Sequence, residues 1–430
     1  MDHVTPYDRF ARQDENIERW LATGAHRDEL RAFFGGREYR SLSILARRAR
    51  VLGVNPRHPR VLLLPGIMGS QLGVERATPL PHDILWLDPL DIHGGRLSAL
   101  RLPDRAPMVP LGIVLFSYLR LKLYLRSRGF AVEAYDYDWR LPVVQLGRRL
   151  AAHLYARRGT RTALVAHSMG GLLVRAALAQ PGTAHVQRAV LLGTPHLGSF
   201  AAVQALRGTY AVVRKVARLD ARASAEELSS KVFSSFPSLY DLLPSAPPGV
   251  ASLLQARGWP RTGPRPRASL LRAARRDRSQ LGALDQRYTL IAGVGQETVT
   301  ALSRRGEDFV YTLTRGGDGT VPVASAAPPG APCLYAPVAH SDLTRDPMVA
   351  AAVVDLLVHG TSARLPNAWK SGSRAQVQVS DGQLRRTHVG KVDWAALGPE
   401  QRRLFLENLN EPPHLRLRVR AGRGRTRAPR

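Results

Sequence analysis

The chain of 430 residues contains almost no cysteine. Its single cysteine, Cys333, excludes an internal disulfide but says little about compartment, because a disulfide-free protein can still be secreted. Hydrophobic residues make up 44% of the chain, which is enough to bury a sizeable core. At about 100–200 residues per domain, the length predicts one large domain with attachments, or two to three units.

Long hydrophobic runs are also missing. The first 20 residues include several acids and no apolar stretch, which excludes a Sec signal peptide. No segment approaches the roughly 18 uncharged apolar residues of a membrane-spanning helix. The best candidate, residues 113–125, is interrupted by Arg120 and Lys122. We therefore expect a cytoplasmic protein, or one exported without a cleavable signal peptide, with no transmembrane segment.

Lysine is scarce, although the chain is strongly basic. Only five of the 62 basic residues are lysine, and the net charge is +28. Two explanations of the arginine excess stay open: a GC-rich genome, or attraction to an anionic surface such as phospholipid, nucleic acid or an acidic partner. The sequence contains no dedicated nucleic-acid-binding motif. Peripheral contact with an anionic membrane is therefore one hypothesis for the charge.

The chain does contain an alternation of strand-like and helix-like segments. Short apolar runs typical of buried strands occupy residues 60–64, 161–167, 188–193, 288–293 and 333–338. Apolar residues at helical spacing occupy residues 111–128, 143–157, 172–180 and 347–358. This order predicts an α/β fold, with a mostly parallel sheet and helices on both faces.

The alternation is interrupted once, and both ends of the chain differ from it. Residues 309–313 are expected to form only a short extra strand. The predicted organisation is an N-terminal helical extension (1–58), the first part of the core (59–199), a helical lid or cap insertion (200–285), the second part of the core (286–360) and a polar C-terminal extension (361–430). We expect the Arg-rich end of that extension to be disordered.

Ser168 is the candidate nucleophile. It stands in Ala-His-Ser-Met-Gly-Gly (166–171), between a predicted strand and a predicted helix. A serine hydroxyl is a poor nucleophile unless a sharp turn exposes it beside a base. Such a turn needs small residues two before and two after the serine, and these are Ala166 and Gly170. An ordinary turn in which Ser168 caps the helix is the alternative reading.

The loop Pro-Gly-Ile-Met-Gly-Ser (65–70) follows the first predicted strand and is a candidate oxyanion hole. An oxyanion hole needs two backbone N–H groups aimed at one point. One normally comes from the residue after the nucleophile, here Met169. The other is expected from this loop, at Ile67. A glycine turn required only for chain geometry is the alternative.

Asp318 and His340 are the candidate partners of the serine. Asp318 lies in a glycine-rich loop (315–322) that follows the predicted strand 288–293, and His340 lies directly after the predicted strand 333–338. The order Ser, Asp, His is that of catalytic triads in the α/β-hydrolase fold. Asp318 alone would pass for a turn residue, so it is the combination of order and position that favours a triad.

With these motifs the chain resembles the lecithin:cholesterol acyltransferase family of lipases and acyltransferases. Within that family it resembles a bacterial-type member. The matching pieces run in family order across about residues 60–360. They are Pro-Gly-Ile-Met-Gly-Ser (65–70), Tyr-Asp-Trp-Arg (137–140), Ala-His-Ser-Met-Gly-Gly (166–171), Gly-Thr-Pro-His-Leu-Gly-Ser (193–199), Tyr-Asp-Leu-Leu-Pro-Ser (240–245), Gly-Asp-Gly-Thr-Val-Pro (317–322) and Ala-His-Ser-Asp-Leu (339–343). The chain departs from secreted family members because it has neither a signal peptide nor a cysteine pair.

The resemblance implies an α/β-hydrolase fold with a lid, and a lipid acyl ester as substrate. It implies the triad Ser168, Asp318 and His340, with Ile67 and Met169 as oxyanion donors. No cofactor and no metal are predicted. Candidate substrate contacts are Gly66, Met68, His167, Trp139 and His196. A packed Trp139 is an equal alternative, and a structural role is favoured for His196.

The predicted activity is hydrolysis of a lipid acyl ester, or O-acyl transfer, through an acyl-enzyme on Ser168. The acceptor, water or an alcohol, stays open. One alternative is a thioesterase or another ester deacylase on the same scaffold. A second alternative is a basic nucleic-acid-binding or membrane-binding protein with an inactive hydrolase fold, which the Arg-Gly tail from 416 to 430 would support.

Overall fold

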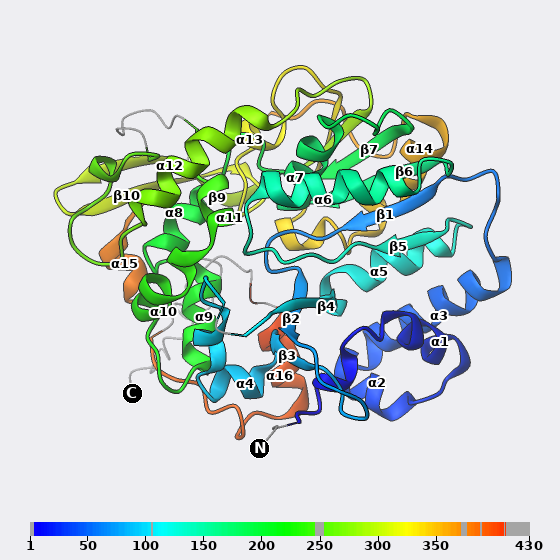
Figure 1. The fold of residues 1–430 in the computed structure, drawn as a ribbon, viewed down its shortest axis with the longest axis horizontal. Helices are drawn as coiled ribbons and strands as arrows, with labels where there is room; N and C mark the ends of the chain where they lie inside the picture. The colour runs from blue at the N-terminus through cyan, green and yellow to red at the C-terminus, as the bar shows by residue number, and fades with distance from the viewer. Residues whose placement is uncertain are drawn as a thin grey trace, which may run out of the picture.

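A sheet of six parallel strands forms the centre of the fold (Figure 1). The structure is a computed structural model, and it describes residues 4–104, 106–245, 253–370, 376–387, 389–407 and 409. In spatial order the strands are β11 (Cys333–Ala336), β8 (Tyr288–Gly293), β7 (Val186–Leu192), β6 (Thr162–His167), β1 (Arg60–Leu64) and β5 (Val132–Ala134). Every neighbouring pair is parallel, so the predicted mostly parallel sheet is confirmed.

Helices cover both faces of this sheet. They are α6 (Val143–Ala156) and α7 (Met169–Leu178) on one face, and α5 (Leu115–Arg126) and α14 (Pro347–His359) on the other. Successive side chains of a strand point to opposite faces. In β1, Leu62 and Leu64 pack with α6 and α7, whereas Val61 and Leu63 pack with α5 and α14. This two-sided burial explains the nearly uninterrupted apolar sequence of the strand.

The order of the strands places a crevice between β1 and β6. After β1 the chain continues to β5 on one side, and it then returns to β6 on the other side of β1. The loops that leave β1 and β6 therefore diverge, and in open α/β sheets ligands bind at such a point. The loop after β1 begins at Pro65, and the turn after β6 holds Ser168.

Helices fill most of the segment between β7 and β8, which was predicted as a helical insertion. They are α8 (Phe200–Leu206), α9 (Ala211–Leu219), α10 (Ala225–Lys231), α11 (Pro237–Asp241) and α12 (Ala268–Asp277). Figure 1 shows α8, α9 and α10 to the left of the central sheet, past the arrowhead of β1. They therefore lie beyond the edge at which the crevice opens.

Two small antiparallel sheets flank the central one, and the sequence predicted little of them. One contains β12 (Val377–Ser380), β10 (Asp308–Gly317) and β9 (Gln296–Arg305), and the other contains β3 (Asp83–Trp86), β2 (Ser70–Val74) and β4 (Val109–Ile113). The prediction of a short strand at 309–313 was wrong in extent, because β10 is longer and forms a hairpin with β9. Strand β9 has mostly polar, partly exposed residues, so it lacks the apolar alternation by which strands are recognised.

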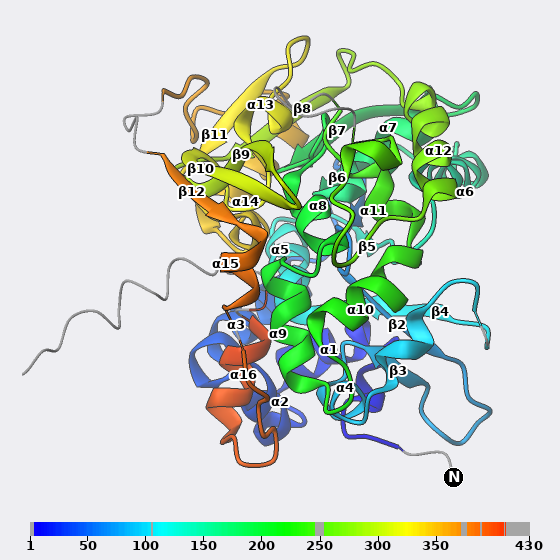
Figure 2. The same cartoon turned by 90° about the vertical axis from the view of Figure 1, so that its left-hand side faces the viewer.

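The two terminal segments pack side by side against the core. The N-terminal segment forms α1 (Asp14–Thr23), α2 (Arg27–Phe34) and α3 (Gly36–Leu52), and the C-terminal segment forms α15 (Asp381–Arg385) and α16 (Pro399–Glu407). Helix α16 contacts α2, and the two lie next to each other in Figure 2, whereas α15 packs against β10. The short helices α4 (Pro89–His93) and α13 (Val323–Ala326) complete the fold. The Arg-rich end that we expected to be disordered lies outside the described residues.

None of the helices in the described part of the chain is long and apolar enough to cross a membrane.

Candidate active site

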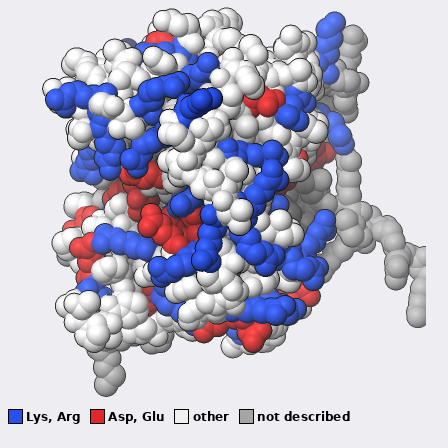
Figure 3. Space-filling view, turned by 90° about the vertical axis from the view of Figure 1, so that its right-hand side faces the viewer, with Lys and Arg blue, Asp and Glu red and all other residues white. Residues whose placement is uncertain are grey.

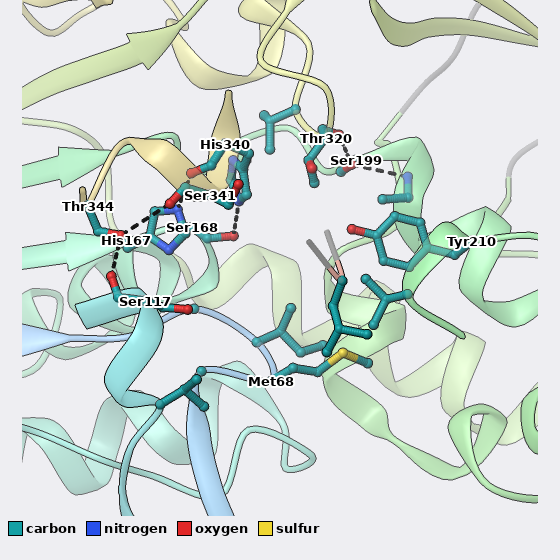
Figure 4. Close-up of a pocket in the computed structure, with 18 of the residues that line it drawn as sticks. Met68, Ser117, His167, Ser168, Ser199, Tyr210, Thr320, His340, Ser341 and Thr344 are labelled. Atoms are coloured by element: carbon teal, nitrogen blue, oxygen red, sulfur yellow. Dashed lines mark hydrogen bonds between the residues drawn. The ribbon is translucent and has the colours of Figure 1, made fainter. Parts of the chain in front are cut away.

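Ser168 occupies a sharp turn between the buried strand β6 and helix α7. Its φ of 54° and ψ of −127° are unusual for a residue other than glycine. Strained backbone of this kind is characteristic of the nucleophile elbow, which lifts a serine above the end of a parallel strand. The Ser168 side chain faces a cavity at the carboxyl edge of the sheet (Figure 4).

The close approach of two loops explains why small residues surround this serine. A Cβ atom on Gly170 would lie 2.5 Å from the carbonyl oxygen of Pro65. A Cβ atom on Gly66 would lie 2.8 Å from the Cβ atom of Ser168. Both distances are shorter than ordinary contacts between carbon and its neighbours, so side chains at Gly66 and Gly170 would push the two loops apart.

The structure brings Ser168, His340 and Asp318 into one hydrogen-bonded line. The His340 Nε2 atom lies 2.9 Å from Ser168 Oγ, and His340 Nδ1 lies 2.7 Å from Asp318 Oδ2. All three side chains are buried. A nucleophile, a base and an orienting carboxylate at such distances form the arrangement that activates serine in hydrolases.

Backbone groups fix the Asp318 carboxylate toward His340. Its Oδ1 atom accepts N–H groups of Thr320 at 2.9 Å and Val321 at 2.7 Å, which leaves Oδ2 for the imidazole. The backbone N–H of His340 donates to the Asp318 carbonyl at 2.8 Å. The sequence reading placed Asp318 in the loop that follows β8, but the β9–β10 hairpin intervenes and Asp318 directly follows β10.

The two candidate oxyanion donors are Ile67, in the loop after β1, and Met169, at the start of α7. Met169 is the first residue of α7, so its N–H has no acceptor within that helix. The N–H of Ile67 has no hydrogen-bond acceptor among the residues that the structure describes. Ile67 also lines the cavity, and Met169 directly follows the serine. Both N–H groups are therefore available to a ligand.

Tyr118, which was not predicted from the sequence, connects the loop 65–70 to the turn at Ser168. Its hydroxyl accepts the Gly66 N–H at 2.9 Å and lies 3.0 Å from His167 Nδ1. The other ring nitrogen, His167 Nε2, lies 3.0 Å from the carbonyl oxygen of His340. A carbonyl only accepts, so Nε2 carries the proton, and the Tyr118 O–H donates to Nδ1. Tyr118 lies on the apolar helix α5, where its spacing indicates only a core position.

His167 stays uncharged in this network. Burial, together with the nearby His340, lowers the pKa of His167 well below its ordinary value of 6.5. The two imidazole rings lie 4.6 Å apart, measured between centroids. A neutral His167 therefore places no positive charge beside His340, which would itself become positive on accepting the serine proton.

Three further aromatic side chains form hydrogen bonds with the backbone of the loop 65–70. The Tyr137 hydroxyl donates to the Pro65 carbonyl at 2.6 Å, and the Trp86 indole donates to the Met68 carbonyl at 2.9 Å. The Trp139 indole donates to the Ser70 carbonyl at 3.0 Å. Trp139 is fully buried and does not line the cavity. This placement corresponds to the packed alternative for Trp139, and a substrate contact there stays a prediction.

His196 also lies away from the cavity. Its backbone N–H donates to the Ser325 carbonyl at 3.1 Å, and its side chain is buried beside Arg175. Burial and the Arg175 charge lower the pKa of His196 to about 3. The structure thus gives His196 buried surroundings that suit a structural role, and a substrate contact there stays a prediction. Gly66, Met68 and His167 do line the cavity.

The cavity in front of Ser168 has a volume of about 120 Å³ and mostly apolar walls. The insertion helices α8, α9 and α11 contribute much of its lining: Ala201, Ala202, Ala205, Val212 and Leu239. Figure 4 shows Met68 and Tyr210 across the cavity from Ser168 and His340. Leu406 and Glu407 of α16 also line it, although no role at the site was predicted for the C-terminal segment. Their polar, Arg-rich surroundings carry no signal of such a role.

A model of one protein family matches part of this chain. The model described as lecithin:cholesterol acyltransferase matches residues 125–262, which include the Ser168 turn and most of the insertion helices. This match confirms the predicted resemblance. No curated protein matches the chain.

Several solved structures are similar to this chain at low sequence identity. A chain of the Tle4–Tli4 complex is 14% identical, with a TM-score of 0.49, over 70% of this chain and 98% of that one. The mature lipase BlEst2 of Bacillus licheniformis is 17% identical, with a TM-score of 0.37, over 71% of this chain and 94% of that one. The lin2722 product of Listeria innocua is 10% identical, with a TM-score of 0.29, over 71% and 96%.

Proposed function

From the resemblance to the lecithin:cholesterol acyltransferase family, we propose that the chain is a serine-dependent lipid acyl-ester hydrolase or O-acyltransferase. The observation that carries the proposal is the line of hydrogen-bond distances from Ser168 Oγ through His340 to Asp318. This line opens into an apolar cavity, as a hydrocarbon acyl group requires. The lid role of residues 200–285 is part of the same proposal.

In the proposed mechanism, His340 Nε2 takes the Ser168 proton while Ser168 Oγ bonds to the ester carbonyl carbon. Asp318 holds the Nδ1 proton and stabilises the imidazolium that forms. The N–H groups of Ile67 and Met169 bind the oxyanion, and one such donor contributes roughly 3 kcal/mol in the transition state. His340 then protonates the leaving alcohol, and an acyl-enzyme remains on Ser168.

The acyl-enzyme is resolved by the same residues acting in reverse. His340 removes a proton from the acceptor, whose oxygen bonds to the acyl carbon, and Ser168 leaves with its proton restored. Water gives hydrolysis and a lipid alcohol gives transfer. Because Ser168 and His340 are almost entirely buried, the outcome depends on which acceptor the cavity admits.

A fluorophosphonate probe tests the proposal, because only an activated serine reacts with it. We expect the wild type to be labelled at Ser168 and to cleave a soluble ester such as p-nitrophenyl butyrate. Ser168→Ala should lose labelling and at least about ten-thousand-fold in kcat. Ser117→Ala is the matched control, because Ser117 lines the same cavity but has no place in the mechanism. An unlabelled wild type would favour a binding protein with an inactive hydrolase fold.

We also propose that the basic surface brings the enzyme to anionic membranes. Figure 3 shows Lys and Arg side chains spread over much of one face, with Asp and Glu in several smaller patches among them. Each well-placed basic residue adds about 1 kcal/mol of attraction to an anionic bilayer. Turnover on vesicles should therefore rise with the anionic lipid fraction and fall with salt, because salt screens the attraction. Turnover that is indifferent to both would contradict this contact.

A further inference from the structure

A second cavity, outside the site described above, lies between the N-terminal and C-terminal segments. Its volume is about 490 Å³. Its walls include the aromatic or apolar side chains of Tyr7, Phe10, Phe33, Trp394 and Leu406, and charged residues such as Arg9 and Arg402 also border it. None of its lining residues falls within 125–262, the part of the chain that matches the family model. This cavity is therefore built from segments that are added to the matched region.

The volumes of the two cavities suggest a division of labour. The cavity in front of Ser168 measures about 120 Å³. Sites that enclose small organic ligands usually measure about 300–1,000 Å³. The catalytic cavity therefore accommodates the reacting ester and a short piece of chain, whereas the second cavity has the size of a complete ligand site.

The two cavities share walls. Phe116 and Leu406 line both of them. A third, smaller cavity links the same neighbourhood, since it is lined by Leu87 and Val114 of the catalytic cavity and by Phe10 of the second cavity. Phe116 alone lines all three cavities.

Two hydrocarbon side chains, Phe116 and Leu406, form the wall that the two cavities share. Phe116 stacks on Phe33 with a centroid distance of 4.4 Å, and Leu406 lies on α16, close to the end of the described chain. Neither residue is tied to its place by a side-chain hydrogen bond, because both side chains are hydrocarbon. Among the described residues, Phe116 and Leu406 therefore separate the two apolar spaces without any polar group between them.

We propose that the second cavity holds the distal part of a substrate hydrocarbon chain whose ester carbonyl lies at Ser168. The proposal rests on the proposed function and deepens it, because it assigns long-chain acyl esters as the substrate class. The occupant follows from continuity: an apolar space that shares its wall with the catalytic cavity suits the apolar continuation of the ester bound there. The terminal segments thus set chain-length preference, and the core carries out the chemistry.

Filling the second cavity tests the assignment. Ala32 and Leu90 line the second cavity but not the catalytic one, and Ala32 is exposed, so Ala32→Trp adds bulk without disturbing the core. Leu90→Trp is an independent second variant. Ala152→Trp is the matched control, because Ala152 is an exposed alanine of α6 that lines neither cavity. The full-length proteins are compared on p-nitrophenyl butyrate and p-nitrophenyl palmitate in the same detergent.

We expect the two filling variants to lose more than about tenfold in kcat/KM on palmitate and to keep wild-type activity on butyrate, because several methylene groups lose their binding space. Ala152→Trp should match the wild type on both esters. An unchanged ratio of palmitate to butyrate activity in both filling variants, or an equal loss on both esters, would overturn the proposal. A wild type that cleaves neither ester would instead overturn the proposed function, so the two failures are distinguishable.

Discussion

The crevice around Ser168 and the layer of terminal segments beside it are held together by different kinds of contact. In the crevice, the decisive contacts involve the backbone and one or two atoms of a side chain. A Cβ atom on Gly66 would come within 2.8 Å of Ser168, and the Asp318 carboxylate is held by N–H groups of Thr320 and Val321. Such contacts tolerate few residue types, and this is why short motifs reveal them.

The terminal layer is held by side chains that reach across helices. Lys122 of α5 is buried and lies 2.7 Å from both Asp14 and Glu18 of α1. Arg120 of α5 donates to Glu38 of α3 at 3.1 Å. Many other charge pairs would serve equally well at these positions, because long charged side chains adapt to one another. The groups around Ser168 are therefore determined by short motifs, whereas the packing of the terminal layer depends on pairs of side chains far apart in the sequence.

The largest loss of activity is expected from Asp318→Asn. This substitution should leave the fold almost unchanged. The amide keeps the shape of the carboxylate but no longer stabilises the imidazolium, so kcat should fall by about ten-thousand-fold. The thermal midpoint, measured by circular dichroism, should remain close to that of the wild type. An Asp318→Asn protein that retains more than about a tenth of the wild-type kcat would break the proposed assignment of the triad.

A smaller loss is expected from Gly66→Ala, which tests whether the close approach of the two loops matters. The added methyl group would displace Ser168 or the oxyanion loop by a fraction of an ångström. Misplacement of about 1 Å near reacting atoms costs roughly a hundredfold in rate. The matched control is Gly159→Ala, because a Cβ atom at Gly159 meets nothing within 4 Å. Equal kcat values for Gly66→Ala and Gly159→Ala would show that the loop contact has no catalytic consequence.

The same contrast explains what could be predicted from the sequence. The parallel sheet, the helices on both faces and the approach of Ser168, Asp318 and His340 follow from apolar runs and from motifs at their ends. The positions of Ile67 and Met169 follow from the same turns. Their roles remain proposals, but their placement required only local residue types and the order of the strands.

The missed features depend on contacts between distant residues. Tyr118 lies in an apolar helix, where nothing distinguishes it from a core tyrosine until the fold brings it to Gly66 and His167. Leu406 reaches the cavity from a segment of polar composition. Strand β12, which lies in the same polar C-terminal segment, pairs with β10 of the core. In each case the decisive partner lies tens to hundreds of residues away, beyond the reach of local periodicity.

Tyr118→Phe should have a moderate effect, because it removes one hydroxyl and leaves two partners. The Gly66 N–H loses its acceptor and His167 Nδ1 loses its donor, and a buried unpaired polar group costs about 1–3 kcal/mol. We expect kcat on p-nitrophenyl butyrate to fall by roughly tenfold with little change in KM. Tyr124→Phe, which removes a more exposed hydroxyl of the same helix, is the control. A normal kcat in Tyr118→Phe would mean that the network only supports the core.

The smallest effect is expected where the core meets the terminal layer, from a carboxyl group that does not touch the catalytic residues. Asp88 is fully buried at the start of α4, where it accepts the Leu90 N–H at 2.8 Å and the hydroxyl of Thr5. Burial raises the pKa of Asp88 to about 7, whereas an aspartate in an unfolded chain titrates near about 4. Between these two values the folded protein keeps a proton that the unfolded chain has lost.

The pH dependence of stability follows from that difference in proton binding. The contribution of Asp88 is fully present below about pH 4 and is lost as the pH rises to about 7, because the unfolded chain ionises in this range while burial keeps Asp88 protonated in the folded state. Asp88→Asn caps the helix equally well but cannot ionise. The thermal midpoint of the wild type should therefore fall relative to that of Asp88→Asn between about pH 4 and pH 7, while their kcat values on butyrate stay equal. Parallel stability curves would contradict the raised pKa of Asp88 in the folded protein. A change in kcat would instead show that this carboxyl group influences the catalytic residues, and the two regions would no longer be separable.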